Sequence, residues 1–184
     1  MKSYNEEDIL KGLHSDDSIV QKRTFEQVVN HYSEKLYWQI RKMVLSHDDT
    51  NDLLQNTFIK AWTNIDLFRG DAKLSTWLYR IAMNESITFL NKQRAQNNIS
   101  IDDQDTFIID KLETDGYFDG DEAQLKLQKA ISSLPDKQRA VFNARYYDEM
   151  PYEKMSEIMK TSVGALKASY HHAAKKIEDF LNNH

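Results

Sequence analysis

The amino-acid sequence predicts an all-α protein made of two small helical domains joined by an acidic, flexible linker. Apolar residues recur at three-and-four spacing along most of the chain, which is the period of a helix with one buried face. Only five Gly and two Pro interrupt the 184 residues, and no alternating apolar stretch is long enough to require a strand. With 40% hydrophobic residues, the chain can bury one ordinary core or two smaller ones.

Four helices are predicted in the first half of the chain. They cover residues 5–13, 18–45, 48–67 and 75–95. The second helix places Val28, Leu36 and Ile40 on one face, and the third places Phe58 and Trp62 likewise. Each of these helices therefore has an apolar stripe that can pack against its neighbours.

Capping residues mark several of the expected helix starts. Ser46 or Asp48 is a suitable N-cap for the third helix, and Ser75 for the fourth. Four shorter helices follow in the second half, over residues 122–133, 135–147, 151–160 and 163–181. Pro135 and Pro151 stand where two of them begin, which suits first-turn positions that need no N–H donor.

Between the two groups of helices lies a strongly acidic segment. Residues 101–123 contain nine acids and one lysine, a net charge of -8, so the rest of the chain carries -5 minus -8, or +3. The segment has two glycines and no helical apolar stripe, so we place domains at 1–96 and 121–184 with a linker at 97–120. The alternative, a solvated loop within one domain, is disfavoured because structureless loops of about 20 residues are uncommon in compact domains.

Composition disfavours several classes of function. The chain has no cysteine, so it can form neither a disulfide nor a thiolate metal site, and a cytoplasmic location is expected. The N-terminus carries acids and no long apolar run, so we expect neither a secretory signal nor membrane insertion. His31 and Glu34 lie three residues apart on a helix, but no nucleophile, phosphate loop or second such pair accompanies them. We therefore expect no enzyme, no cofactor and no metal.

The C-terminal 34 or so residues resemble a helix-turn-helix, in which the second helix enters the major groove of DNA. A short helix, a tight break at 160–162 and a longer helix follow one another. The longer helix has an apolar stripe formed by Val163, Leu166, Tyr170, Ala173, Ile177 and Phe180. Its remaining surface is cationic and hydrogen-bonding, which suits phosphates and base edges, although a solvated helical hairpin would look similar. His171 and His172 are adjacent and point about 100° apart, so they form a poor metal pair.

The first domain ends in a basic loop and helix. Residues 69–94 hold five basic and two acidic residues, a net of +3. A polar stripe on the helix consists of Arg80, Asn84, Thr88 and Asn91. Because amides can pair with base edges and aromatics can stack on unpaired bases, this surface suits a base flipped out of the duplex. Trp77 and Tyr79 either offer such stacking surfaces or fill the core.

Three segments carry a resemblance to a known family. FRGDAKLSTWLYRIAMN resembles the promoter-melting segment of bacterial sigma factors of the extracytoplasmic-function group, and DLLQNTFIKAWTNI resembles their polymerase-gripping segment. LPDKQRAVFNARYYDEMPYEKMSEIMKTSVGALK resembles their C-terminal helix-turn-helix domain. The three segments cover both predicted domains in the family's order. The resemblance implies a transcription initiation factor that binds core RNA polymerase, directs it to promoters and helps to open the minus-10 DNA.

The resemblance also implies partners and site residues. The expected partners are core RNA polymerase, promoter DNA in duplex and single-stranded form, and an anti-sigma factor. The implied polymerase-binding residues are Asp52, Gln55, Asn56 and Ile59, while Phe58 and Trp62 are expected in the core. The implied minus-10 residues are Arg69, Gly70, Asp71, Lys73, Arg80, Asn84, Thr88, Lys92 and Arg94. The implied minus-35 residues are Ser162, Gly164, Lys167, Ser169, His171, His172, Lys175 and Lys176.

The sequence departs from the family pattern in ways that weaken its contacts with DNA. The family often has an arginine pair where this chain has residues 91–94, and His172 and Ala174 stand where many members have arginines. Fewer fixed charges predict weak binding to DNA alone, so promoter affinity would depend on polymerase tethering both domains. The acidic linker either enters the basic channels of polymerase or is simply solvated. A stand-alone helix-turn-helix regulator and a sigma-like decoy are the remaining alternatives.

Overall fold

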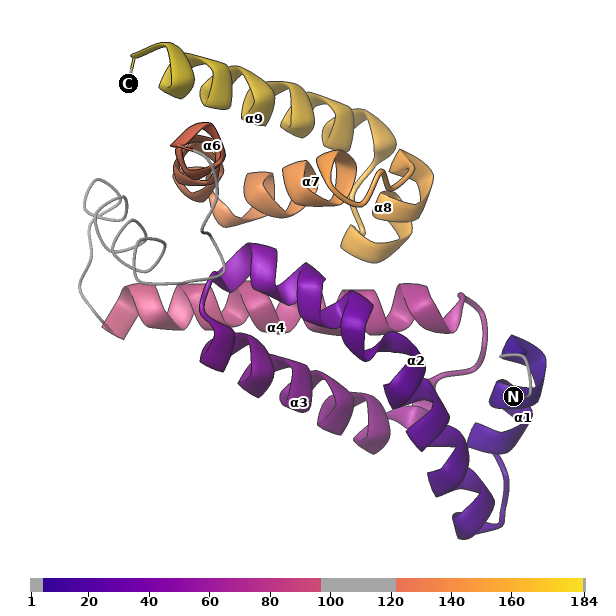
Figure 1. The fold of residues 1–184 in the computed structure, drawn as a ribbon. Helices are drawn as coiled ribbons and strands as arrows, with labels where there is room; N and C mark the ends of the chain where they lie inside the picture. Colours follow the sequence, from indigo (N-terminus) through magenta and orange to yellow (C-terminus); the bar gives the residue numbers. More distant parts are fainter. Residues whose placement is uncertain (1–4, 97–121, 184) are drawn as a thin grey trace.

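The computed structural model describes residues 5–96 and 122–183, and all regular structure in them is helical (Figure 1). The first group of elements is α1 (Glu6–Leu13), α2 (Ser18–Val44), α3 (His47–Thr63), the 3₁₀ turn η1 (Ile65–Leu67) and α4 (Leu74–Gln96). The second group is α6 (Glu122–Ser132), α7 (Asp136–Tyr146), α8 (Tyr152–Met159) and α9 (Val163–Asn183). The all-α prediction is confirmed, and the predicted linker at 97–120 lies outside the described residues.

Most helix starts follow from local side-chain chemistry. Ser46 rather than Asp48 caps α3, because the Ser46 hydroxyl oxygen accepts a hydrogen bond from the Asp49 N–H at 3.2 Å. Pro135 and Pro151 stand one position before α7 and α8, where their carbonyls accept the first helical bonds. The predicted first-turn placement of these prolines is therefore off by one residue. The missing N–H of proline costs no hydrogen bond at this position, because an N–H there would have no acceptor within the helix.

Two predicted helix ends are wrong. Ser75 does not cap α4, because the Lys73 carbonyl already accepts the Trp77 N–H at 3.2 Å and Ser75 lies inside the first turn. The helix expected over 48–67 ends at Thr63, because the Asn64 amide donates to the Lys60 carbonyl at 2.8 Å. Such side-chain bonding to a terminal carbonyl competes with the helical ladder, and the chain continues as η1.

The N-terminal helices form a bundle in which α2, α3 and α4 pack side by side and α1 lies against α2 (Figure 1). The interior holds Leu36 and Ile40 from α2, Ala61 from α3 and Leu78 from α4, all fully buried. Burying a leucine or isoleucine contributes roughly 1.5–3 kcal/mol, so these contacts set the packing of the bundle. Among residues 5–96 and 122–183, no helix combines the length and apolar character required to span a membrane.

The C-terminal helices enclose a smaller core. Phe142 of α7 is buried and stacks on Tyr146 and Tyr170, with ring centroids 5.1 and 5.6 Å apart. α8 and α9 are joined by three residues, of which Lys160 is left-handed with φ 53°. Ser162 then caps α9, since its hydroxyl oxygen accepts from the Ala165 N–H at 3.2 Å. The predicted break at 160–162 is confirmed.

The two groups of helices are in contact, α7 with α2 and α8 with α4 (Figure 1). One apolar cluster of buried residues continues from the N-terminal bundle into α7, α8 and the start of α9. Arg139 crosses this boundary, donating to the Met43 carbonyl at 2.8 Å and to the Ser132 carbonyl at 2.6 Å. Burial lowers the pKa of Arg139 to about 10, while nearby Asp136 opposes that shift. We call this packing of the two groups the closed arrangement.

Candidate nucleic-acid and protein interfaces

The residues expected to bind polymerase form one exposed stripe on α3. Asp52, Gln55, Asn56 and Ile59 follow one another at spacings of three, one and three residues, and Ile59 keeps 53% of its surface exposed. An exposed isoleucine among polar side chains suits a protein partner better than phosphate. The prediction for Phe58 is confirmed, since it is buried. Trp62 is half-buried and packs on Phe25, with ring centroids 5.0 Å apart.

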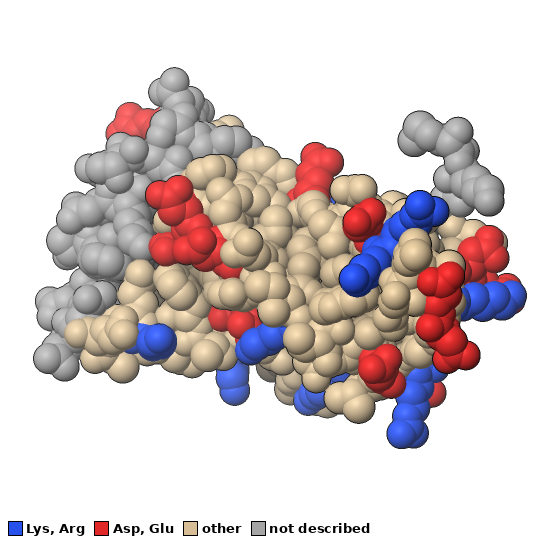
Figure 2. All heavy atoms as spheres, turned by 90° about the horizontal axis from the view of Figure 1, so that it is seen from below, with Lys and Arg blue, Asp and Glu red and all other residues tan. Residues whose placement is uncertain are grey.

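The charge distribution on the lower face fits the same interpretation. Figure 2 views the molecule from below Figure 1, and on this face Lys and Arg are scattered between Asp, Glu and uncharged residues. They do not form a continuous basic band there. Since phosphate binding relies on clustered cations, this face is better suited to a protein than to a nucleic-acid backbone.

The basic loop before α4 is exposed and starts from a fixed position. Arg69, Asp71 and Lys73 are exposed, and Gly70 has φ +79°, a conformation that side chains other than glycine's rarely adopt. Phe68, which precedes the loop, is buried and stacks on Trp77 with ring centroids 4.8 Å apart. The polar side chains of the loop therefore extend outward next to the packed Phe68–Trp77 pair.

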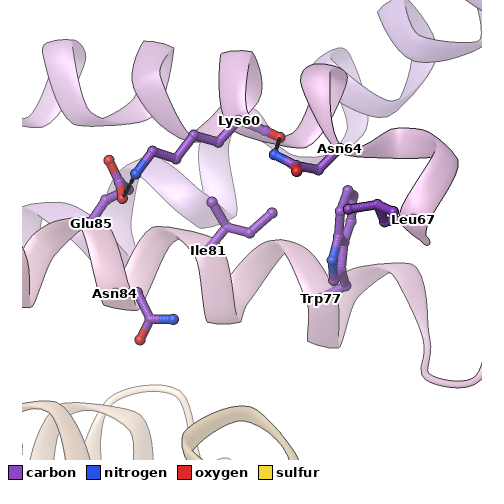
Figure 3. A pocket seen from close by; sticks show the side chains of 7 residues that line it. All are labelled: Lys60, Asn64, Leu67, Trp77, Ile81, Asn84 and Glu85. Atoms are coloured by element: carbon purple, nitrogen blue, oxygen red, sulfur yellow. Dashed lines mark hydrogen bonds and ion pairs between the residues drawn. The ribbon is translucent and has the colours of Figure 1, made fainter.

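A pocket of about 350 Å³ opens between α3 and α4 (Figure 3). Its lining residues are Lys60, Asn64, Leu67, Trp77, Ile81, Asn84 and Glu85. At one end of the pocket, the Lys60 ammonium pairs with the Glu85 carboxylate at 2.5 Å (Figure 3). Asn84 is exposed, lines the pocket and points from α4 away from α3 (Figure 3). The volume lies at the small end of ligand pockets, which run from about 300 to 1,000 Å³.

Sequence reasoning found only part of this pocket. It singled out Asn84 and Trp77, but it did not find Lys60 and Glu85, two residues 25 positions apart that face each other from α3 and α4. The resemblance also implied minus-10 residues in the loop at 69–73, whereas none of the described lining residues comes from this loop. Leu67, just before the loop, lines the pocket and is 74% exposed. The sequence signal that could have identified Leu67 is that it is a large apolar residue next to a basic loop.

Trp77 combines the two roles considered from the sequence, whereas Tyr79 packs against the core. Both are half-buried and pack against the core. Trp77 also lines the pocket, so part of its ring remains available to a ligand. The Lys154 ammonium lies 5.5 Å from the centre of the Tyr79 ring, and burial raises the pKa of the Tyr79 hydroxyl. The core interpretation therefore holds for both residues, and Trp77 adds a pocket wall.

The remaining minus-10 candidates on α4 divide into two groups. Thr88 and Lys92 are exposed. Arg80 instead donates to the Glu157 carbonyl of α8 at 2.7 Å, and Arg94 pairs with Asp136 of α7 at 2.5 Å. The two arginines are thus held by the C-terminal helices in the closed arrangement, which periodicity alone could not reveal.

The minus-35 candidates lie on and just before α9. Ser162, Gly164, Lys167, His171, His172, Lys175 and Lys176 are exposed, and Ser169 is half-buried. Lys176 donates to the Gln138 side chain at 3.1 Å, and the Lys167 ammonium lies 5.7 Å from the centre of the Tyr152 ring. The stripe of Leu166, Ala173 and Ile177 is buried, so the polar candidates occupy the outer face of the second helix. This is the geometry that a recognition helix requires.

Comparison with known proteins agrees with the division of the described helices into two groups. The family model for Sigma-70 region 2 matches residues 28–96, and that for Sigma-70, region 4 matches residues 124–177. ECF RNA polymerase sigma factor SigW of Bacillus subtilis is 30% identical over 167 residues, covering 86% of this chain and 89% of SigW. The ECF RNA polymerase sigma-E factor of Haemophilus influenzae is 30% identical, covering 86% and 87%.

The chain belongs to the family of ECF RNA polymerase sigma factors, and it is a transcription initiation factor that binds RNA polymerase. Solved structures share the fold. The sigma factor RpoE in complex with the anti-sigma factor NepR from Bartonella quintana has a TM-score of 0.67 at 23% identity, covering 86% of this chain and 96% of RpoE. CnrH in complex with the cytosolic domain of CnrY has a TM-score of 0.66 at 20% identity, covering 97% of each chain.

Proposed function

We propose that this chain holds core RNA polymerase through the exposed stripe of α3 and reads two promoter elements. Residues 1–96 would recognise and open the minus-10 element, and residues 121–184 would read the minus-35 element with α9. The segment 97–120 would connect the two domains. Polymerase performs the chemistry of RNA synthesis, and this chain supplies recognition and strand opening without an active site of its own. It would therefore act in the cytoplasm, where polymerase and promoter DNA are.

The pocket between α3 and α4 carries the minus-10 part of the proposal. A base that leaves the duplex needs a concave site with an apolar wall and a few polar groups. Trp77 and Ile81 supply the wall, and the exposed Asn84 amide supplies a donor and an acceptor for a base edge. The exposed Arg69 and Lys73 would attract the backbone next to that base.

The closed arrangement sets a condition for promoter binding. Arg80 and Arg94 contact α8 and α7, so they can reach DNA only when these contacts are exchanged for contacts with phosphate. Because α9 carries three lysines and two acids, its own attraction for DNA is small. We infer that polymerase holds both domains at once, so that the second DNA contact becomes intramolecular.

An anti-sigma factor is the further protein partner we propose. The structure of RpoE that shares this fold was obtained with the anti-sigma factor NepR. Such a partner would compete with polymerase for the surfaces described above. Core polymerase added to a mixture of the chain and its anti-sigma factor should therefore displace the anti-sigma factor as its concentration rises.

The test is run-off transcription on a promoter library with purified bacterial core polymerase and the intact chain. The comparison includes Asn84→Ala and, as a matched control, Asn30→Ala, an exposed asparagine on α2. We expect promoter-specific transcripts that require the chain, with minus-10 discrimination falling about tenfold in Asn84→Ala, the worth of one good base contact. The control should behave as the wild type. If no promoter responds while the chain alone shifts duplex DNA, the chain is a stand-alone regulator, and if neither occurs it is a decoy.

A further inference from the structure

The N-terminal helix α1 has an unexpected relation to the basic loop at 69–73. α1 is fixed on α2 by its buried residues Ile9 and Leu13, and the Gln21 side chain donates to the Leu13 carbonyl at 2.9 Å. Gly12 allows the two helices to approach closely, because a Cβ at this position would lie 2.3 Å from the Thr24 hydroxyl oxygen. α1 is therefore a rigid neighbour of the loop rather than a loose terminus. It also lies outside residues 28–96, the part that matches the Sigma-70 region 2 family.

Two hydrogen bonds join α1 to the residues that flank the loop on either side. The Leu74 N–H, directly after the loop, donates to the Glu6 carboxylate at 2.9 Å. The Phe68 carbonyl, directly before the loop, lies 2.8 Å from His14 Nε2. The loop is thus held at both ends by one helix that lies more than 50 residues away in the sequence.

The chemistry of both bonds fits a holding role. His14 Nδ1 faces the Leu10 carbonyl at 3.0 Å, so both ring nitrogens face acceptors, and the ring must donate at Nε2 to bond Phe68. The Glu6 carboxylate meets an N–H at the start of α4, where the helix dipole favours negative charge. Between the two bonds, the Leu10 Cδ1 lies 3.7 Å from where a Cβ of Gly70 would be. Glu6 and Leu10 of α1 and His14, its C-cap residue, recur every four residues, so they lie on one side of the helix.

We propose that α1 braces the promoter-melting loop, with Glu6 and His14 as positioning residues for strand opening. This inference rests on the proposed function of the loop. A loop of five residues that is free to move must lose conformational entropy when it holds a strand, and fixing both of its ends in advance removes much of that cost. The brace therefore acts on the opening of duplex DNA and not on the binding of polymerase, which uses α3.

The first measurement tests the brace in the free chain, without polymerase or DNA. Hydrogen exchange is compared for the wild type, Glu6→Ala, His14→Ala and the control Asp8→Ala, which removes an exposed acid from the first turn of the same helix. We expect faster exchange in residues 68–77 for Glu6→Ala and His14→Ala, with α2 and α3 unchanged. Glu6→Gln keeps a carbonyl oxygen that can accept the Leu74 N–H and should restore protection. Unchanged exchange over 68–77 in both alanine variants overturns the brace.

The second measurement tests its role with core polymerase and promoter DNA. In Glu6→Ala and His14→Ala, affinity for core polymerase should stay at the wild-type value. Open-complex formation on duplex promoter should fall about tenfold, as expected for losing a hydrogen bond to a charged group such as the Glu6 carboxylate. A promoter already unpaired at the minus-10 element should restore opening. If opening on duplex DNA is unaffected, or if polymerase binding falls in parallel with it, the positioning role is refuted. If the wild type itself opens no promoter, the proposed function fails, and the exchange experiment still decides the brace.

Discussion

Replacing Gly12 by alanine tests how closely α1 must approach α2. Alanine is favoured over glycine inside a helix by roughly 0.5–1 kcal/mol, so propensity alone predicts a more stable protein. The added Cβ would, however, lie 2.3 Å from the Thr24 Oγ1, 2.8 Å from its Cγ2 and 3.0 Å from its Cβ. Thr24 cannot simply turn away, because it is buried and its hydroxyl donates to the Val20 carbonyl at 2.8 Å.

The two effects have opposite signs, and the clash is the larger. Overpacking of this kind costs about 1–3 kcal/mol, so we expect a net loss of about 1–2 kcal/mol in the free energy of unfolding. Complete undocking of α1 would expose Ile9 and Leu13 and cost about 3–6 kcal/mol, so α1 should shift rather than detach. Urea unfolding followed by circular dichroism measures the difference.

A control and a rescue make this prediction specific. A Cβ on Gly164 would meet nothing within 4 Å, so Gly164→Ala should be neutral or stabilise by up to about 1 kcal/mol. Thr24→Ala removes the two closest atoms, so it should restore most of the stability lost in Gly12→Ala, with a coupling of about 1 kcal/mol in the double-mutant cycle. A Gly12→Ala protein as stable as the wild type, or a rescue that fails, would refute the reasoning.

Three further outcomes follow from the packing of the C-terminal helices and from burial. Phe142→Ala should lower the free energy of unfolding by about 3–5 kcal/mol in urea, because it removes a buried ring that stacks on two others, and a loss under 1 kcal/mol would contradict that packing. Arg139→Met leaves two buried carbonyls without a donor but relieves the buried charge, so we expect a net loss of about 2 kcal/mol, against about 0.5 kcal/mol or less for the exposed Lys137→Met. Equal effects of these two substitutions would count against the bridge. Burial raises the pKa of Tyr79 and Tyr147, so these tyrosines should ionise at the highest pH in an ultraviolet titration. Tyr79→Phe and Tyr147→Phe should each reduce the absorbance change at that end of the titration. The contribution of buried, protonated Tyr79 and Tyr147 to the free energy of unfolding is complete below about pH 10, where an unfolded tyrosine ionises. It falls as the pH rises above that value.

The sequence predicts those parts of the fold that depend on neighbours along the chain. The helix at 163–181, its apolar stripe and the break before it depend on spacing within one segment, and the structure has α9 at Val163–Asn183. Contacts between distant segments have no such signal. Nothing in the local pattern distinguishes the Lys60–Glu85 pair from two solvated charges, or shows that the start of α4 is bonded by Glu6 instead of Ser75.

The same distinction between local pattern and distant contacts separates the candidate-site residues that the sequence could predict from those that it could not. The position of Asn84 on an exposed polar helix face could be predicted from its spacing and the family pattern, and the structure shows it exposed at the pocket. The engagement of Arg80 by Glu157 could not, since it joins residues 77 apart across two domains. Periodicity identifies which side of a helix is polar, but the partner that meets this side depends on tertiary packing.

If Arg80 and Arg94 bind promoter DNA as proposed, their contacts with the C-terminal helices would make that binding a competition within the chain itself. If only a fraction of the molecules is open, the apparent dissociation constant for DNA equals the intrinsic constant divided by that fraction. A closed form about ten times as abundant as the open one therefore weakens DNA binding by about tenfold. If polymerase holds the domains apart, as we propose, it would act as an allosteric ligand that raises DNA affinity without adding a DNA contact. By thermodynamic linkage, promoter DNA would then raise the affinity of the chain for polymerase by the same factor.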